Sequence, residues 1–124
     1  MRKDISPTIL VVDDDPAIRS LLRMALEVSG YRALEAVNGE EAVSIAEHSH
    51  PDLILMDIAM PKRSGISAMH QIRKNLGIRV PIVAMTAYVE AGLDREAARA
   101  GFNEVLVKPL FIDHLKDTLN RHLN

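Results

Sequence analysis

Short apolar runs alternate with longer amphipathic segments along the whole chain. Most of the runs are rich in β-branched residues, which is typical of strands buried on both faces of a parallel sheet. The segments between them carry apolar residues at helical spacing. Five runs are predicted as strands: Thr8–Val12, Arg32–Val37, Leu53–Asp57, Pro81–Thr86 and Glu104–Val107.

Turn and capping residues mark the ends of the first predicted helix. Pro16 suits its first turn, with Asp14 or Asp15 as the N-cap, and Gly30 suits its end. The apolar positions of this segment recur at helical spacing, so we expect them to face the sheet. They are Ile18, Leu21, Leu22, Ala25 and Val28.

The same signals place the other helices. Asn38 and Glu41 have the spacing of a capping box at the start of the second helix, and Pro51 follows its end. The third helix is predicted to start at Ser64–Gly65 and to run as one helix to Leu76. The buried positions expected in these two helices are Ala42, Ile45, Ala46, Ala68, Met69, Ile72 and Leu76. The last two helices are predicted from about Leu93 to Ala100, and from about Ile112 with Leu115, Leu119 and Leu123 buried.

Five strands alternating with five helices predict an α/β fold with a doubly wound, five-stranded parallel sheet. The crossovers are expected to be right-handed. Ligands of such folds bind at the carboxyl ends of the strands, near the point where the strand order reverses. The residues that end the strands are therefore the candidates for function.

Polar residues that suit a phosphoryl site follow four of these strands: Asp13, Asp14 and Asp15, then Asp57, Thr86 and Lys108. Two carboxylates about 4 Å apart repel by about 4 kcal/mol at an effective dielectric near 20. Such a cluster therefore favours a bound hard cation, and oxygen ligands without His or Cys favour Mg²⁺. Taken singly, each residue has an ordinary structural role, as a helix cap, a loop residue, a strand-end hydroxyl or a solvated lysine. Their joint occurrence favours a site for a phosphoryl group.

Composition narrows the function further. The 124 residues suit one domain, and the absence of cysteine excludes disulfides and thiolate sites. A formal net charge of -2 and an aromatic content of 3% argue against nucleic-acid binding. We find no apolar segment long enough to cross a membrane and no signal peptide, so we expect a cytoplasmic location.

The motifs together resemble the receiver domains of bacterial two-component response regulators. The matching segments are Ile9–Pro16, Leu55–Pro61 with Gly65, Met85–Ala87 and Val107–Pro109. The resemblance implies a flavodoxin-like, receiver-type sheet and one receiver domain over residues 1–124, with 1–7 as an N-terminal extension.

The resemblance also assigns the site residues. It makes Asp57 the phosphoacceptor, with Thr86 and Lys108 contacting the phosphoryl group. It places Mg²⁺ on Asp13, Asp14, Asp57 and the backbone carbonyl of Ala59. It further implies a cis Lys108–Pro109 peptide bond.

By the same resemblance, the phosphoryl donor is a phosphohistidine on a sensor histidine kinase or a histidine-phosphotransfer protein. The domain would then act as a conformational switch or a phosphorelay carrier. It would phosphorylate and dephosphorylate itself and would not be a turnover enzyme. We expect the partner to contact Pro109 and Leu110. Ile18 and Leu22 are further candidates, with a place in the core as the alternative for these two residues. We expect no contact with nucleic acid or membrane, and the oligomeric state stays open, a phosphorylation-dependent dimer being one form.

Two positions, Val105 and Ala59, depart from the family pattern, and a third, Tyr88, lies near Thr86 in the chain. Val105 stands where the family usually has the aromatic residue of its activation switch, so we expect Val105 to pack simply as part of a strand. Ala59 stands where a polar side chain is common, and Tyr88 is the nearest aromatic residue to Thr86 along the chain. The five histidines lack the spacing of metal ligands and are expected on the surface or at helix ends.

Two other functional classes were weighed. A Mg²⁺-dependent phosphatase on a related α/β fold would want a second aspartate two residues after Asp57, where this chain has Ala59. A flavodoxin-like cofactor binder would want a glycine-rich phosphate loop, which the chain lacks.

Overall fold

The computed structural model describes residues 6–58, 60, 64–87 and 92–123. Within these residues, five strands form one parallel sheet in the order β2-β1-β3-β4-β5. The strands are β1 (Thr8–Val12), β2 (Arg32–Ala36), β3 (Leu53–Asp57), β4 (Ile82–Thr86) and β5 (Glu104–Val107). The helices are α1 (Pro16–Val28), α2 (Gly39–Ser49), α3 (Ser64–His70), α4 (Leu93–Ala100) and α5 (Ile112–Leu123). The predicted α/β class with a doubly wound parallel sheet is confirmed.

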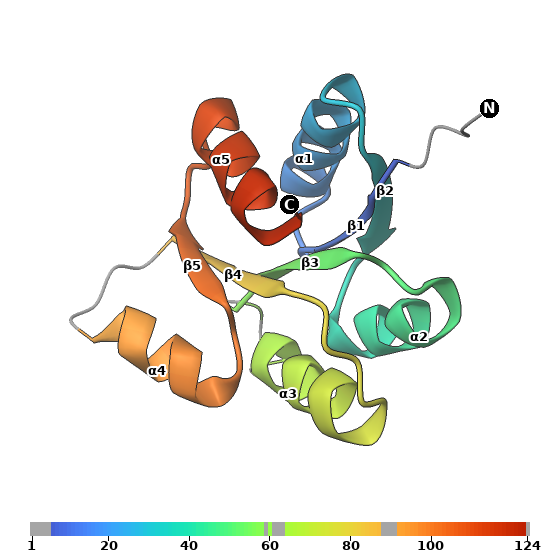
Figure 1. Ribbon diagram of the computed structural model, residues 1–124, viewed down its shortest axis with the longest axis vertical. Helices are drawn as coiled ribbons and strands as arrows, with labels where there is room; N and C mark the ends of the chain where they lie inside the picture. Colours follow the sequence, from blue (N-terminus) through green and yellow to red (C-terminus); the bar gives the residue numbers. More distant parts are fainter. Residues whose placement is uncertain (1–5, 59, 61–63, 88–91, 124) are drawn as a thin grey trace.

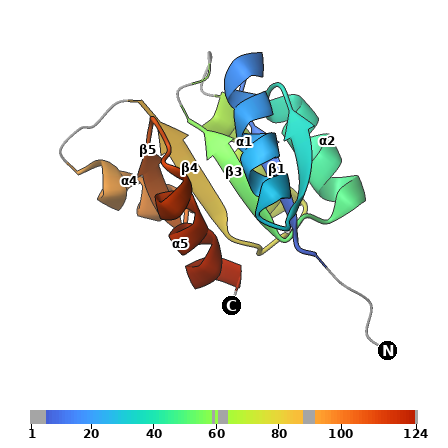
Figure 2. The ribbon, with the colours of Figure 1, turned by 90° about the horizontal axis from the view of Figure 1, so that it is seen from above.

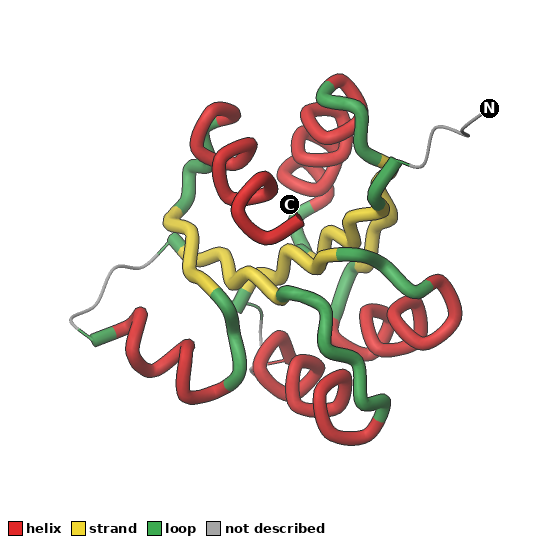
Figure 3. Tube along the Cα trace, in the orientation of Figure 1, coloured by secondary structure: helices red, strands yellow, loops and turns green. Residues whose placement is uncertain are grey.

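Helices cover both faces of the sheet. In Figures 1 and 3, α1 and α5 lie on one side of the strands, and α2, α3 and α4 lie on the other. In the view from above in Figure 2, α1 and α5 lie in front of the strands. Because successive side chains of a strand point to opposite faces, β1 contributes to two cores. Ile9 and Val11 belong to the core under α1 and α5, and Leu10 and Val12 belong to the core over α2 and α3.

The apolar face of α1 is narrower than the sequence indicated. Leu22 and Leu26 are buried, but Leu21 is 63% exposed and Val28 is 88% exposed. The expectation that Leu21 and Val28 face the sheet is therefore wrong. Leu22 and Leu26 are four residues apart and lie on one face of the helix. Leu21 and Val28 lie on its flank.

The third helix changes its winding before its end. The sequence predicted one helix from Ser64 to Leu76, but α3 ends at His70 and continues as a π-helix over Gln71–Asn75. The amide of Leu76 donates to the carbonyl of Gln71, 3.1 Å away, which is the spacing of a π-turn. Ile72 is still buried as predicted. The guanidinium of Arg73 donates to the Ile78 and Val80 carbonyls beyond the helix, at 3.1 and 2.6 Å, and so ties this turn to the segment before β4.

The predicted N-caps are confirmed at both helices, but the capping box at α2 is shifted, because Glu41 Oε1 accepts from the amide of Val37, one residue before the N-cap, at 2.8 Å. Asp15, and not Asp14, caps α1, because its Oδ1 accepts from the amides of Ala17 and Ile18 at 2.9 and 3.5 Å. At α2, the Asn38 side chain accepts from the Glu41 amide at 2.8 Å. As for membranes, the helices formed by the described residues are all too short or too polar to span one.

Candidate functional site

Four strand ends meet where the strand order reverses. β1 and β3 are neighbours in the sheet although β2 lies between them in the chain. Asp13 directly follows β1, Asp57 ends β3, Thr86 ends β4, and Lys108 directly follows β5. The parallel register pairs Asp57 with Met85, one residue before Thr86. The topology therefore brings the candidate residues from the sequence together at one edge of the sheet. This edge is formed by the carboxyl ends of the strands, where ligands of such folds bind.

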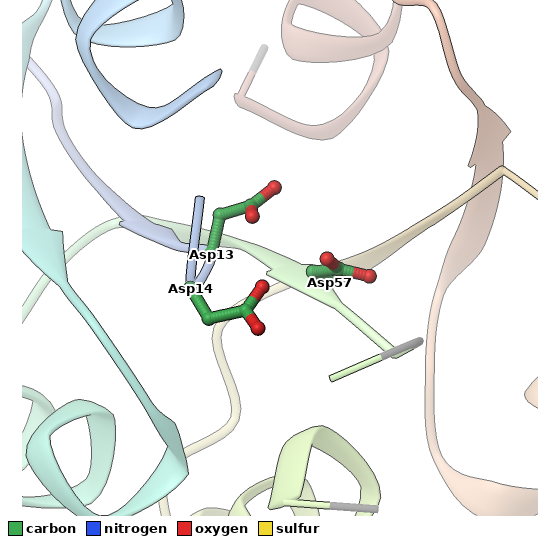
Figure 4. Close-up of side chains that lie close together, drawn as sticks. All are labelled: Asp13, Asp14 and Asp57. Atoms are coloured by element: carbon green, nitrogen blue, oxygen red, sulfur yellow. The ribbon is translucent and has the colours of Figure 1, made fainter. Parts of the chain in front are cut away.

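Three carboxylates share this edge, as Figure 4 shows. Each of Asp13, Asp14 and Asp57 offers an oxygen, and these oxygens all lie within 4.8 Å of one another. Asp13 and Asp57 are buried, whereas Asp14 is exposed. A group of carboxylate oxygens this close, with one member open to solvent, fits a hard divalent cation that keeps part of its water shell. The residues present could thus hold a metal ion.

Lys108 offsets part of the charge repulsion in this cluster. Its Nζ lies 2.7 Å from Asp13 Oδ2 and 3.1 Å from Asp57 Oδ2, so one ammonium joins the ends of β1 and β3. Burial of the ammonium would lower the pKa of Lys108. The hydrogen bonds and charges of Asp13 and Asp57 outweigh burial and raise that pKa above its ordinary value. Lys108 therefore stays charged throughout the physiological range and faces the phosphoacceptor candidate.

A backbone hydrogen bond joins Lys108 to Thr86 at this edge of the sheet. The Lys108 amide donates to the Thr86 carbonyl at 2.7 Å. Thr86 itself is buried. The peptide bond between Lys108 and Pro109 is cis, as the resemblance implied. Thr86 is the last residue of β4, which pairs with β3, the strand that ends at Asp57.

The sequence did not reveal two residues that shape the site. Arg19 of α1 donates from Nη1 to the Asp13 carbonyl oxygen at 2.9 Å. Gly65 of α3 packs so closely on β3 that a Cβ there would lie 2.5 Å from the Asp57 carbonyl oxygen. Gly65 belongs to the motif that carried the resemblance, but its contact was not predicted. The contact of Arg19 goes to a backbone atom, which leaves no pattern in the side chains.

Other predicted positions fall outside the site or outside the described residues. Ala59 and Tyr88 lie outside the described residues, so the expected backbone ligand at Ala59 stays a prediction. Val105 is partly buried and packs against the same core as Leu10 and Val12, as expected for a strand residue. Beside it lies a pocket of about 290 Å³ between α4 and β5.

The histidines lie where they were expected. His48, His50, His70 and His114 are exposed. His122 is half-buried near the end of α5, where its Nε2 lies 2.8 Å from Glu104 Oε1. Among the described residues, no histidine belongs to a cluster that could hold a metal ion.

Comparison with known proteins agrees with this geometry. The family model of the response regulator receiver domain matches residues 9–120. The regulatory protein AtoC of Escherichia coli is 37% identical over 115 residues, which cover 93% of this chain and 25% of AtoC. An uncharacterized 14.6 kDa protein of Leptolyngbya boryana is 44% identical over 104 residues, which cover 82% of this chain and 79% of that protein. The chain therefore spans about a quarter of the length of AtoC and most of the other relative.

A solved structure shows the same fold. The receiver domain of the sensor histidine kinase PA1611 from Pseudomonas aeruginosa superposes with a TM-score of 0.84 at 38% identity, covering 96% of this chain and 98% of that one. That structure holds a magnesium ion coordinated in its active site cleft.

The fold, the acidic cluster at the sheet edge and the family match over residues 9–120 define the class of protein. The chain belongs to the response regulator receiver domains of two-component systems. Such domains are signalling domains and not classical enzymes, and they interact with phosphodonor kinases or phosphotransfer proteins. The comparisons give no support to the alternative of a Mg²⁺-dependent phosphatase.

Proposed function

We propose that Asp57 is the phosphoacceptor of this receiver domain and takes its phosphoryl group from a phosphohistidine. The observation that carries this proposal is the position of Lys108 Nζ, 3.1 Å from Asp57 Oδ2 and 2.7 Å from Asp13 Oδ2. An ammonium there neutralises charge on the oxygens of an incoming phosphoryl group. Asp57 ends the central strand β3 and faces this ammonium, so its carboxylate suits nucleophilic attack on phosphorus.

The transfer exchanges one bond to phosphorus for another. A carboxylate oxygen of Asp57 attacks phosphorus in line, and an O–P bond forms as the N–P bond of the phosphohistidine breaks. The electron pair of the broken bond stays on the imidazole. Lys108 and the Thr86 hydroxyl are placed to contact the transferred oxygens. Water later hydrolyses the acyl phosphate, so the domain is both phosphorylated and reset through its own residues.

Asp13, Asp14 and Asp57 would hold the Mg²⁺ ion, with the Ala59 carbonyl as a further ligand. The mutual approach of the three carboxylates within 4.8 Å supports this assignment, as does the magnesium ion in the related PA1611 receiver. When bound, Mg²⁺ would supply positive charge that stabilises the phosphoryl oxygens.

The donor would be a sensor histidine kinase or a histidine-phosphotransfer protein, and the phosphorylated domain would act as a switch or a relay carrier. We take residues 1–124 as one receiver domain, with residues 1–7 as an extension before β1.

Labelling with a small phosphodonor tests the assignment. The protein is incubated with acetyl phosphate and Mg²⁺, and the intact mass is followed. We expect one added phosphoryl group in the unchanged protein and none in Asp57→Asn. Asp52→Asn is the matched control, because Asp52 directly precedes the first residue of the strand that ends at Asp57. The Asp52 side chain accepts a hydrogen bond from the Thr8 amide at 2.7 Å. Unchanged labelling of Asp57→Asn would refute the proposal.

A further inference from the structure

Arg19 connects α1 to the backbone of the acidic cluster. Its side chain is only 15% exposed, although it belongs to a helix at the surface of the molecule. Nη1 donates to the Asp13 carbonyl oxygen at 2.9 Å, and Nε donates to Glu35 Oε1 at 3.0 Å. The guanidinium thus bridges the end of β1 and the edge strand β2.

Asp13 is held at each of its polar groups. Its amide donates to the Ala36 carbonyl at 3.2 Å, and its Oδ1 accepts from the Asp15 amide at 2.9 Å. Its Oδ2 accepts from Lys108. Arg19 supplies the donor for the remaining group, the carbonyl. Because an ionised donor makes a stronger hydrogen bond than a neutral one, this contact fixes the direction of the carbonyl.

The direction of this carbonyl also bears on Asp14. The Asp13 carbonyl and the Asp14 amide belong to one planar peptide group. The orientation of that group sets ψ of Asp13 and φ of Asp14. Holding the Asp13 oxygen therefore restricts the backbone that carries two of the three carboxylates that could bind a cation.

Glu35 in turn orients Arg19. The guanidinium of Arg23, one turn further along α1, forms an ion pair with Glu35, with Nε 2.8 Å from Oε2. Glu35 also lies opposite Val11 in the register of β1 and β2, two residues before Asp13. One carboxylate of the edge strand therefore forms ion pairs with two arginines, and among the described residues only Arg19 of these two is bonded to the Asp13 carbonyl.

We propose that Arg19 is a positioning residue for the acidic cluster: it holds the Asp13–Asp14 peptide in the conformation that brings both carboxylates close to Asp57. This inference rests on the proposed phosphoacceptor function. Arg19 makes no direct contact with the phosphoryl group in this scheme and acts through Asp13.

Arg23 offers a matched control, because Arg23→Ala also removes one arginine of α1 and one partner of Glu35 but leaves the Asp13 carbonyl bonded. The first measurement uses the metal-free protein and follows amide hydrogen exchange by NMR. In Arg19→Ala we expect faster exchange at the Asp13 and Asp15 amides relative to core amides such as that of Leu55. In Arg23→Ala we expect these amides to keep their protection. A loss of global stability alone would not single out these two amides.

The second measurement is the Mg²⁺ dissociation constant from calorimetric titration. Substitution of a residue that orients a metal ligand typically weakens metal binding by about 10- to 100-fold. We expect about tenfold weaker Mg²⁺ binding in Arg19→Ala. Arg23→Ala should bind Mg²⁺ like the unchanged protein. Arg19→Lys keeps the charge but loses the fork that serves two acceptors, so its affinity should lie between the two. If Arg19→Ala does not fold, Arg19→Lys beside Arg23→Lys carries the same comparison.

The outcomes separate this inference from the function on which it rests. Equal exchange and equal Mg²⁺ affinity in the Arg19 and Arg23 variants would overturn the role of Arg19 and leave Asp57 as the phosphoacceptor. Failure of the unchanged protein to bind Mg²⁺ and to accept a phosphoryl group would overturn the proposed function itself.

Discussion

Gly65 shows how a single side chain would disturb the phosphoacceptor strand. A Cβ at this position would lie 2.5 Å from the Asp57 carbonyl oxygen and 3.3 Å from Ile58 Cα, and both are backbone atoms that cannot swing aside. We expect Gly65→Ala to lower the free energy of unfolding by about 1–3 kcal/mol, the usual cost of overpacking. We also expect slower phosphorylation, because the strand end that carries Asp57 must shift.

Urea denaturation and labelling with acetyl phosphate check both effects. Ser67→Ala is the control, since Ser67 is exposed on the same helix. Equal stability of Gly65→Ala and Ser67→Ala would show that α3 can move away from β3 without cost.

At the scale of residues, the sequence predicted which side chains meet at the sheet edge but not the residues that hold them there. Asp13, Asp57 and Lys108 could be predicted because charged groups directly after buried strands are conspicuous, and the resemblance gave each a role. Whether Asp14 or Asp15 caps α1 stayed open until the structure showed Asp15 accepting from two amides. Arg19 could not be found in the same way, because its partner at the site is a carbonyl oxygen that every residue carries.

At the scale of elements, Glu104 ties the start of β5 to the end of α5. It pairs with the Arg121 guanidinium and with His122 Nε2. Burial would raise the pKa of Glu104, but the hydrogen bonds and charges of Arg121 and His122 outweigh it and hold that pKa below its ordinary value. A carboxylate with a lowered pKa stabilises the folded state fully above the ordinary pKa of 4.5, and the contribution is lost as the pH falls through the folded-state value.

We therefore expect Glu104→Gln to change the pH dependence of folding in acid. The melting temperature of the unchanged protein should fall more steeply below pH 4.5 than that of the variant. Glu96→Gln, at an exposed position of α4, should keep the steep fall of the unchanged protein. Parallel acid profiles for Glu104→Gln and the unchanged protein would mean that the pair contributes nothing to folding.

The elements themselves were predicted to different depths. The strands were predicted to within a residue at each end. Four of them are short apolar runs that contain β-branched residues. The fifth, β2, has none and is only partly buried, and its bounds follow from the turn and cap residues on either side. The π-turn after His70 was not predicted, because the apolar positions of this segment fit one continuous α-helix. The bonds from Arg73 to the Ile78 and Val80 carbonyls leave no pattern in the side chains either. The apolar face of α1 was overestimated because helical spacing alone does not tell which apolar residues meet the sheet.

At the scale of the whole molecule, the order of the strands makes the site. Alternating strands and helices predicted a doubly wound sheet, but the alternation does not say which strands are neighbours. The order β2-β1-β3-β4-β5 places β1 beside β3. Asp13 and Asp57 become neighbours for this reason alone, although 43 residues separate them in the chain.

The same arrangement brings an apolar surface next to the site. A pocket of about 130 Å³ lies between α1 and the segment after β5. It is lined by Ile18, Leu21, Leu22, Lys108, Pro109 and Leu110. Lys108 also donates to Asp57, so the pocket adjoins the phosphoacceptor candidate. Of the two α1 residues first expected to contact a partner, Leu22 is buried in the core and Ile18 is half-buried. Leu21 is the α1 residue that combines exposure with a place in the pocket.

We expect a partner that delivers a phosphoryl group from histidine to cover this surface, whereas a small phosphodonor need not. We expect Leu21→Asp to slow phosphotransfer from a phosphohistidine domain by about tenfold, equivalent to about 1.4 kcal/mol. Labelling by acetyl phosphate should be unchanged, because Leu21 has no contact with Asp57, Asp13 or Lys108 that the proposed chemistry uses. Val28→Asp is the matched control: Val28 is more exposed than Leu21 but lies at the far end of α1 and outside the pocket. Stopped-flow or gel-based phosphotransfer rates would compare the variants. Equal rates for Leu21→Asp and Val28→Asp would exclude the pocket from the docking surface, and slower labelling by acetyl phosphate in Leu21→Asp would mean that the substitution damages the site itself.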